Sequence, residues 1–197
     1  MKPRNLITAS LVLAMVFGAV AVAQYGGKEK QKQQQPADTR SLQGKKAPVF
    51  EMPTLDGQTV KLADLKGDVV VLDFWATWCG PCVAAMPHLQ ELANNTELKE
   101  KGLKVFAVNL RENPDKVKAF IEQNNYTFTV PMDKEGKVAE SYKIRGIPTQ
   151  VVIGRDGMIK KVFVGDGGDQ LNQAVEQALK AKGSTARGPA TQPSSES

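Results

Sequence analysis

Scarce residue types limit what this 197-residue chain can do. It contains one histidine, His88, and two cysteines, Cys79 and Cys82. A metal site needs more ligands than these, and His88 is expected on the same helix as the cysteines, where it converges poorly with both thiols. A copper-handling protein needs a distant histidine in the second half of its domain, and this sequence has none. We therefore expect no metal, and no cofactor apart from the cysteine pair.

The chain also lacks a basic run interleaved with aromatic residues. Its formal charge is +5, and part of that excess comes from Lys2 and Arg4 near the N-terminus. A mild positive excess without aromatic interleaving argues against a nucleic-acid surface. We find no internal repeat.

The N-terminus has the pattern of an export signal. Lys2 and Arg4 precede an apolar run that extends from Leu6 to Ala23 and ends in Ala-Val-Ala. Small residues at that end indicate that residues 1–23 are a signal peptide, cleaved after Ala23. The alternative is an uncleaved membrane anchor, because the run is nearly long enough to span a bilayer. Either way, the remainder is expected to work outside the cytoplasm, in the periplasm or another extracytoplasmic space.

Two segments have little to bury. Residues 24–44 are rich in Gly, Lys and Gln, and residues 183–197 are rich in Gly, Ser, Thr, Pro and Ala. Such compositions predict a flexible linker and a disordered tail. The folded domain is therefore expected over residues 45–182.

Within that domain, short apolar runs alternate with helical patterns. The continuous apolar run Val69–Trp75 is typical of a strand buried on both faces. Strand–helix–strand units followed by a hairpin and a helix predict an α/β sandwich whose mixed sheet is covered on both sides. The expected strands cover residues 49–52, 58–62, 69–75, 103–110, 126–131, 149–153 and 158–164, and the expected helices cover residues 80–98, 114–124, 137–142 and 169–182.

The residues that carry chemistry follow the first buried strand. Cys79 and Cys82 are three residues apart at an expected helix start, so their sulfurs can form a small disulfide ring. The helix N-terminus favours the thiolate form of Cys79, which makes it the nucleophile, while Cys82 lies one turn deeper and resolves the mixed disulfide. Gly80 and Pro81 set the geometry of the turn, and Trp78 is expected on the substrate-facing surface.

A purely structural disulfide is the plainer interpretation of the cysteine pair in an exported chain. A loop of two residues constrains the unfolded chain very little, so this disulfide would be a poor staple. The Cys-x-x-Cys spacing between a strand and a helix instead favours redox chemistry.

The segment Trp75-Ala-Thr-Trp-Cys-Gly-Pro-Cys82 resembles the active site of thioredoxins. Most of residues 45–180 resembles the exported TlpA/ResA-like thiol–disulfide oxidoreductases, which carry a redoxin/AhpC-TSA-like domain. The N-terminal hairpin and an inserted helix and strand near 114–132 mark that branch. The resemblance implies a thioredoxin-like three-layer sandwich with a mixed central sheet. It also implies a reductase of disulfides in exported proteins, such as apocytochrome c, supplied with electrons by a membrane thiol donor. The alternative is an oxidant or isomerase of secreted proteins.

Asp73 interrupts the apolar strand six residues before Cys79. A buried acid costs free energy unless it serves a purpose, and burial raises its pKa. In thioredoxins, an aspartate at the matching position exchanges protons with the buried cysteine, so the resemblance implies that role for Asp73 toward Cys82. The alternative is an acid at a strand end that reaches solvent. This chain departs from thioredoxins in placing Ala107 where they have a nearby lysine.

Two further features bear on the substrate. Arg145-Gly-Ile-Pro-Thr149 resembles the thioredoxin segment whose proline is cis, which implies that the backbone of Ile147, before Pro148, pairs with an extended substrate. The alternative is a trans proline that opens a strand. A thiol peroxidase is disfavoured, because Leu72 and Ala76 stand where peroxiredoxins place Pro and Thr.

Overall fold

The structure, a computed structural model, describes residues 38–181. The expected signal peptide, most of the expected linker and the expected tail lie outside the described residues. Within residues 38–181, no helix combines the length and the apolar character that crossing a membrane requires.

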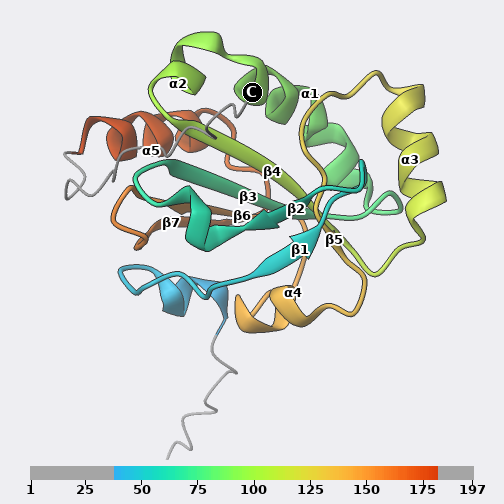
Figure 1. Cartoon of the computed structure of the whole chain (residues 1–197), viewed down its shortest axis with the longest axis horizontal. Coiled ribbons are helices and arrows are strands. Elements are labelled where there is room, and N and C mark those ends of the chain that lie inside the picture. The colour runs from blue at the N-terminus through green and yellow to red at the C-terminus, as the bar shows by residue number, and fades with distance from the viewer. Residues whose placement is uncertain (1–37, 182–197) are drawn as a thin grey trace, which may run out of the picture. The chain divides into compact units, whose positions relative to one another are not determined.

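A mixed five-stranded sheet lies at the centre of the domain (Figure 1). Its strand order is β5-β4-β3-β6-β7, in which β3 pairs parallel to β4 and antiparallel to β6. The parallel pairing places the carboxyl ends of β3 and β4 side by side. The antiparallel pairing brings the start of β6 to that same edge. The strands are β3 (Val69–Trp75), β4 (Leu103–Leu110), β5 (Met132–Asp133), β6 (Thr149–Ile153) and β7 (Ile159–Val164).

Alternate residues of β3 point to opposite faces of the sheet, and all seven are buried. Val69 and Val71 pack with α5 (Gly168–Lys180), whereas Trp75 packs with α1 (Gly80–Asn94) and α3 (Pro114–Gln123). Val70, Leu72 and Phe74 pack on the other side, against α4 (Lys137–Ser141) and the N-terminal hairpin. The predicted three-layer thioredoxin-like sandwich is confirmed.

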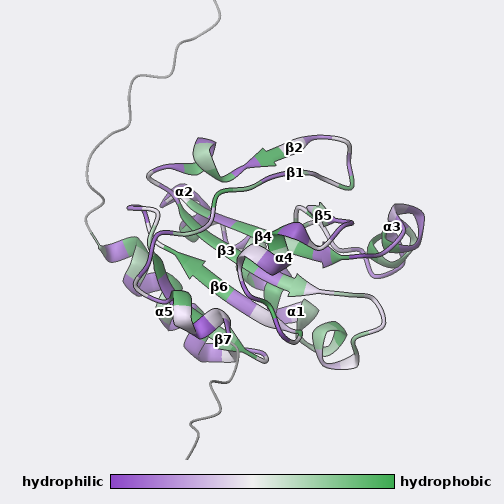
Figure 2. Ribbon diagram, turned by 90° about the horizontal axis from the view of Figure 1, so that it is seen from below, coloured by the Kyte–Doolittle hydropathy of each residue, from purple (hydrophilic) through white to green (hydrophobic). Residues whose placement is uncertain are grey.

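The distribution of hydropathy follows these layers. In Figure 2, β3 is largely hydrophobic along its length, whereas α3 and α5 alternate between hydrophobic and hydrophilic residues. On α5, the buried positions are Leu171, Val175 and Ala178, which recur at helical spacing. A sheet covered by helices requires strands that are hydrophobic on both faces and helices that are hydrophobic on one face.

The N-terminal hairpin forms as predicted. Strands β1 (Glu51–Pro53) and β2 (Thr59–Lys61) pair antiparallel around the Asp56-Gly57 turn. The hairpin leads into a short 3-10 helix, Leu62–Leu65, before β3 begins.

The helix predicted over residues 80–98 is wrong in one respect, because it is divided. Helix α1 ends at Asn94 and α2 (Thr96–Glu100) begins after Asn95, whose backbone is extended. The Asn95 side chain accepts a hydrogen bond from the Leu98 N–H (3.0 Å) and so caps α2. A local side-chain bond of this kind competes with continuation of a helix.

The strand predicted over residues 126–131 is also wrong. Only isolated bridges form there, at Thr129 and Pro131, and the ladder with β4 is made by Met132 and Asp133. The aromatic side chains of residues 126–128 were mistaken for a strand pattern. Instead, Tyr126 and Phe128 stack on one another and pack toward the cluster that contains the cysteines.

The folded domain begins before the expected boundary at residue 45. Residues Thr39–Leu42 form a 3-10 helix in which Thr39 and Leu42 are buried. Leu42 joins the core cluster, and the Thr39 hydroxyl donates to the Lys143 carbonyl (3.0 Å). Leu42 and Thr39 together attach this segment to the domain, although its composition resembles a linker.

Candidate active site

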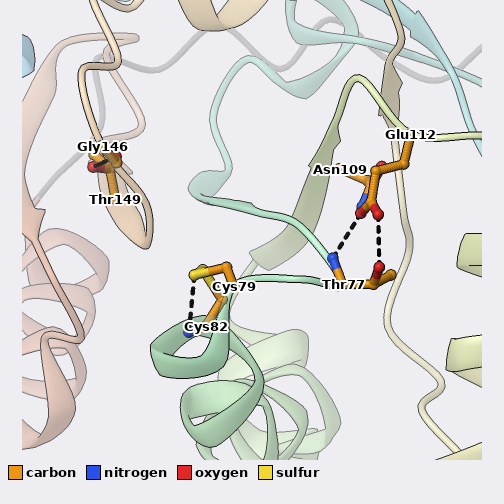
Figure 3. Close-up of a disulfide and its surroundings, with 7 residues drawn as sticks. All are labelled: Thr77, Cys79, Cys82, Asn109, Glu112, Gly146 and Thr149. Atoms are coloured by element: carbon orange, nitrogen blue, oxygen red, sulfur yellow. Dashed lines mark hydrogen bonds between the residues drawn. A yellow bond between two sulfur atoms is a disulfide. The ribbon is translucent and has the colours of Figure 1, made fainter.

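The two cysteines form a disulfide at the point where β3 gives way to α1. Cys79 is the N-cap of α1, and its Sγ accepts a hydrogen bond from the Cys82 N–H at 3.2 Å (Figure 3). The S–S distance is 2.09 Å. The first turn of a helix has unpaired N–H groups and the positive end of the dipole, which together favour a thiolate at Cys79 once the disulfide is reduced.

Cys82 is more shielded than Cys79, with 1% and 5% of their surfaces exposed. Both belong to an apolar cluster with Trp75 and Met86. Trp78 differs from these neighbours, because 69% of its surface is exposed beside the disulfide.

Gly80 and Pro81 occupy the first turn of α1 and are exposed. A proline is tolerated there because its missing N–H has no partner in the first turn of a helix. The predicted residues Trp78, Gly80 and Pro81 are therefore exposed on either side of the buried Cys79 in sequence.

Asp73 is buried, with 2% of its surface exposed. It lies on β3 two residues before Trp75, and so on the sheet face that α1 covers. Burial raises the pKa of Asp73 to about 7, a hydrogen bond from Gln150 opposes that rise, and Asp166 adds to it. The alternative of an acid that reaches solvent is wrong, and the position opposite Asp73 on β4 is Ala107, as expected.

Gln150 is the partner of Asp73 that sequence reasoning missed. It lies opposite Asp73 in the antiparallel pairing of β3 with β6 and is buried. Its Oε1 accepts from the Gly167 N–H (2.8 Å), which fixes the amide and turns its N–H groups toward the acid. Within the described residues, the Asp73 Oδ1 atom has no hydrogen-bond partner. This carboxyl is thus only partly satisfied.

The segment before β6 faces the disulfide (Figure 3). The Ile147–Pro148 peptide bond is cis, as the motif predicted. The Thr149 hydroxyl donates to the Gly146 carbonyl (2.7 Å), and the Ile147 side chain packs against the cluster that contains both cysteines. The Ile147 N–H and C=O form no backbone hydrogen bond among residues 38–181.

A buried carboxylate, Glu112, holds the loop that leads to Cys79. Its oxygens accept from the Thr77 N–H and hydroxyl, both at 2.6 Å (Figure 3). They also accept from Asn109 Nδ2 (2.9 Å) and Lys116 Nζ (2.8 Å). Burial raises the pKa of Glu112, but the hydrogen bonds from Lys116, Thr77 and Asn109 outweigh that effect and lower it to about 2.

Sequence analysis did not single out Glu112. Thr77 and Glu112 are 35 residues apart, and they meet because β3 and β4 run parallel and end at the same edge. The sequence offered one clue. Glu112 comes just after β4, and β4 lies beside β3, the strand that leads to the cysteines. His88 lies on α1, and both of its ring nitrogens are buried without a hydrogen-bond partner among the described residues.

The described part of the chain contains no cluster of three or more His, Cys, Asp or Glu side chains able to hold a metal ion.

Comparison with known proteins agrees with this geometry. The sequence model of the AhpC/TSA family matches residues 43–162. The thiol-disulfide oxidoreductase ResA of Bacillus cereus is 34% identical over 180 residues, which cover 91% of this chain and 98% of that protein.

Solved structures share the fold. A putative thiol:disulfide interchange protein DsbE from Chlorobium tepidum has a TM-score of 0.64 and 38% identity, with 70% of this chain and 97% of that chain covered. A secreted Mycobacterium tuberculosis disulfide oxidoreductase homologous to E. coli DsbE has a TM-score of 0.56 and 25% identity, with coverage of 72% and 99%. With a cysteine pair at the start of α1 and relatives matched over nearly their whole length, the chain belongs to the AhpC/TSA family and, within it, to the ResA-type thiol–disulfide oxidoreductases.

Proposed function

We propose that this oxidoreductase reduces disulfides of exported proteins outside the cytoplasm, with apocytochrome c as one such client. The observation that carries the proposal is Asp73, a buried acid beneath the helix that bears Cys82, whose pKa is raised to about 7. An acid that titrates near neutral pH can take a proton from a buried thiol and return it later.

The first step is attack by the Cys79 thiolate on one sulfur of the client disulfide. The other client sulfur leaves as a thiolate, and a mixed disulfide joins Cys79 to the client. The position of Cys79 as the N-cap of α1 supports this role, because the helix terminus stabilises negative charge on its sulfur.

The second step releases the client. Asp73 accepts the Cys82 proton, and the Cys82 thiolate attacks Cys79 Sγ. The second client sulfur leaves as a thiolate, the Cys79–Cys82 disulfide forms, and two electrons have passed to the client. A membrane thiol donor then returns two electrons and restores the dithiol.

Client binding is assigned to the surface around Trp78, Gly80 and Pro81 and to the backbone of Ile147 beside the cis Pro148. The unpaired N–H and C=O of Ile147 support pairing with an extended client segment. This mode reads the backbone of a client and so accepts many sequences.

Export is part of the proposal. The signal-like residues 1–23 support it, as does the similarity to a secreted oxidoreductase of M. tuberculosis. Membrane contact through the chain itself arises only if that N-terminal segment is not cleaved.

The reduction potential tests the direction of electron flow. Equilibration of the protein with glutathione or dithiothreitol couples, read by thiol alkylation, is expected to give a value near roughly −270 mV. A value near roughly −120 mV indicates instead an oxidant of secreted proteins and overturns the reductase assignment. Rapid turnover of peroxide in place of disulfides would favour a thiol peroxidase.

Cysteine variants test the two-step mechanism. Cys79→Ser is expected to abolish turnover, whereas Cys82→Ser is expected to accumulate DTT-sensitive adducts with client proteins, because the mixed disulfide forms but cannot be resolved. If Cys82→Ser collects no such adduct in the cell envelope, dithiol exchange is not the mechanism.

A further inference from the structure

A groove adjoins the disulfide. Its volume is about 570 Å³, and both Trp78 and Ile147 line it. Trp78 immediately precedes Cys79, and Ile147 packs against the cysteine cluster, so a client held at the disulfide extends into this groove. Leu110, Ala139 and Ile144 add apolar surface to the lining, and Arg111, Glu140 and Arg145 supply its charges.

The charges of this groove are not balanced. Arg111 and Arg145 are exposed, and neither forms an ion pair or a side-chain hydrogen bond with any residue of the described chain. The carboxylate in the lining is Glu140, so the formal charge of the lining is positive. Unpaired guanidinium groups beside an apolar floor suit carboxylates on an otherwise apolar partner.

The backbone and packing of Arg111 add to this argument. Arg111 has φ of 56°, a left-handed conformation that is unfavourable for a residue other than glycine. Its guanidinium lies against Gly136, where a Cβ would overlap it. The side chain is therefore held in the groove by its contact with Gly136 and does not extend freely into solvent.

We propose that this groove selects clients whose reactive cysteine is flanked by acidic residues, so that the charge of the client segment determines how fast its disulfide is reduced. The proposal rests on the proposed reductase function and adds a substrate class to it. The client backbone pairs at Ile147, and its flanking carboxylates meet Arg111 and Arg145. Electrostatic steering of this kind acts mainly on the association rate and weakens as salt is added.

The test uses three synthetic peptides that differ only in the residues flanking one cysteine: paired Glu, paired Gln or paired Lys. Each cysteine is linked by a disulfide to β-mercaptoethanol, so that reduction yields the peptide thiol, free mercaptoethanol and the oxidised protein. The reduced full chain is mixed with each peptide, and the second-order rate constant is measured by quenched alkylation. At low salt we expect the Glu peptide to react about tenfold faster than the Lys peptide, and the ratio to shrink at about 0.5 M salt.

Variants of the charged groove residues test whether these residues cause the rate difference between the peptides. In Arg111→Gln/Arg145→Gln, the Glu-to-Lys rate ratio is expected to fall to about one, and in Arg145→Glu to drop below one. Glu140→Gln is expected to raise the ratio. The matched control is Lys66→Gln/Lys104→Gln, which removes the same charge at the amino ends of β3 and β4, away from Cys79, and is expected to keep the parental ratio.

The outcomes separate this inference from the proposed function. If all three peptides are reduced at equal rates at low salt, or if the control lowers the ratio as much as the arginine variants do, charge selection by the groove is wrong and the reductase stands. If the reduced chain leaves all three disulfides intact, the reductase function itself fails. A ratio inverted by Arg145→Glu cannot come from a folding defect, because misfolding slows every peptide alike.

Discussion

Two buried carboxyl groups flank the redox disulfide, and their surroundings are opposite. Glu112 accepts four hydrogen bonds, from Thr77, Asn109 and Lys116, and its pKa is lowered to about 2. Asp73 has one side-chain donor, Gln150, and its pKa is raised to about 7. The difference shows that the supply of hydrogen-bond donors, more than burial alone, decides whether the pKa of a buried acid falls or rises.

The largest expected effect concerns Asp73 and the pH dependence of stability. Because folding raises its pKa from 3.8 to about 7, its contribution to stability is complete below pH 3.8 and is lost as pH rises through 7. Asp73→Asn removes this loss, so the oxidised variant is expected to exceed the parent by up to about 4 kcal/mol at pH 8 and by far less at pH 4.

Urea unfolding of oxidised protein at both pH values measures this difference. The exposed acid Asp64 supplies the control, since Asp64→Asn is expected to leave the pH dependence of the parent unchanged. A parent and an Asp73→Asn variant with the same dependence on pH would mean that Asp73 is ionised in the folded protein at little cost.

Glu112→Gln should act with the opposite sign. The amide presents donors where Thr77 and Lys116 also donate, so the variant is expected to lose about 3 kcal/mol of stability at pH 7. Since folding lowers the pKa of Glu112, its contribution is present above pH 4.5 and is lost as pH falls through about 2.

Denaturant unfolding of the Glu112→Gln and Glu122→Gln variants measures the loss of stability that each replacement causes. Glu122 lies on α3, the helix that follows Glu112, and is largely exposed, so its replacement is expected to cost less than about 0.5 kcal/mol. Equal losses in the two variants would remove the contrast between an anchored and an ordinary carboxylate.

The same Asp73→Asn variant should slow the second chemical step. Without a proton acceptor beneath α1, release of the client by Cys82 is expected to slow by roughly a hundredfold at pH 7, while attack by Cys79 is nearly unchanged. Single-turnover quenching that counts mixed disulfide and product separately measures the two steps. Parallel slowing of both steps would indicate a general disturbance of the site, because a missing proton acceptor slows only the second.

The smallest effect is expected at Lys116, which is the exposed donor to Glu112. Its side chain is 59% exposed, so Lys116→Met is expected to cost less than about 1 kcal/mol. Thermal or urea unfolding at pH 7 measures it. A loss as large as that of Glu112→Gln would mean that the ion pair, and not the hydrogen bonds from Thr77 and Asn109, holds the loop.

Local patterns predicted the parts of the site that lie close together in sequence. Short local motifs were enough to identify three features: the Cys79/Cys82 pair, the acid at Asp73 and the Ile147-Pro148 pair. The strands β3, β4 and β6 were also predicted with their observed bounds, because continuous apolar runs identify buried strands.

What sequence reasoning missed depends on pairing between distant segments. Gln150 meets Asp73 only through the register of β6 on β3, and Glu112 meets Thr77 only because two parallel strands end together. The break at Asn95 had a local cause, a capping side chain, but it was hidden by apolar residues that continued the helical spacing.

Arg111 and Glu112 are consecutive residues with unrelated tasks, since one lines the groove and the other holds the loop before Cys79. The backbone of Arg111 is left-handed at this point, where the side chain of Arg111 lines the groove and that of Glu112 contacts Thr77. Substitution at position 111 can therefore change the preference for clients while the loop stays in place. Insertion or deletion of a single residue between Asn109 and Asn113 changes both tasks at once. Lineages of this enzyme are expected to vary at position 111 among residues that tolerate a left-handed backbone, while keeping the length of the segment fixed.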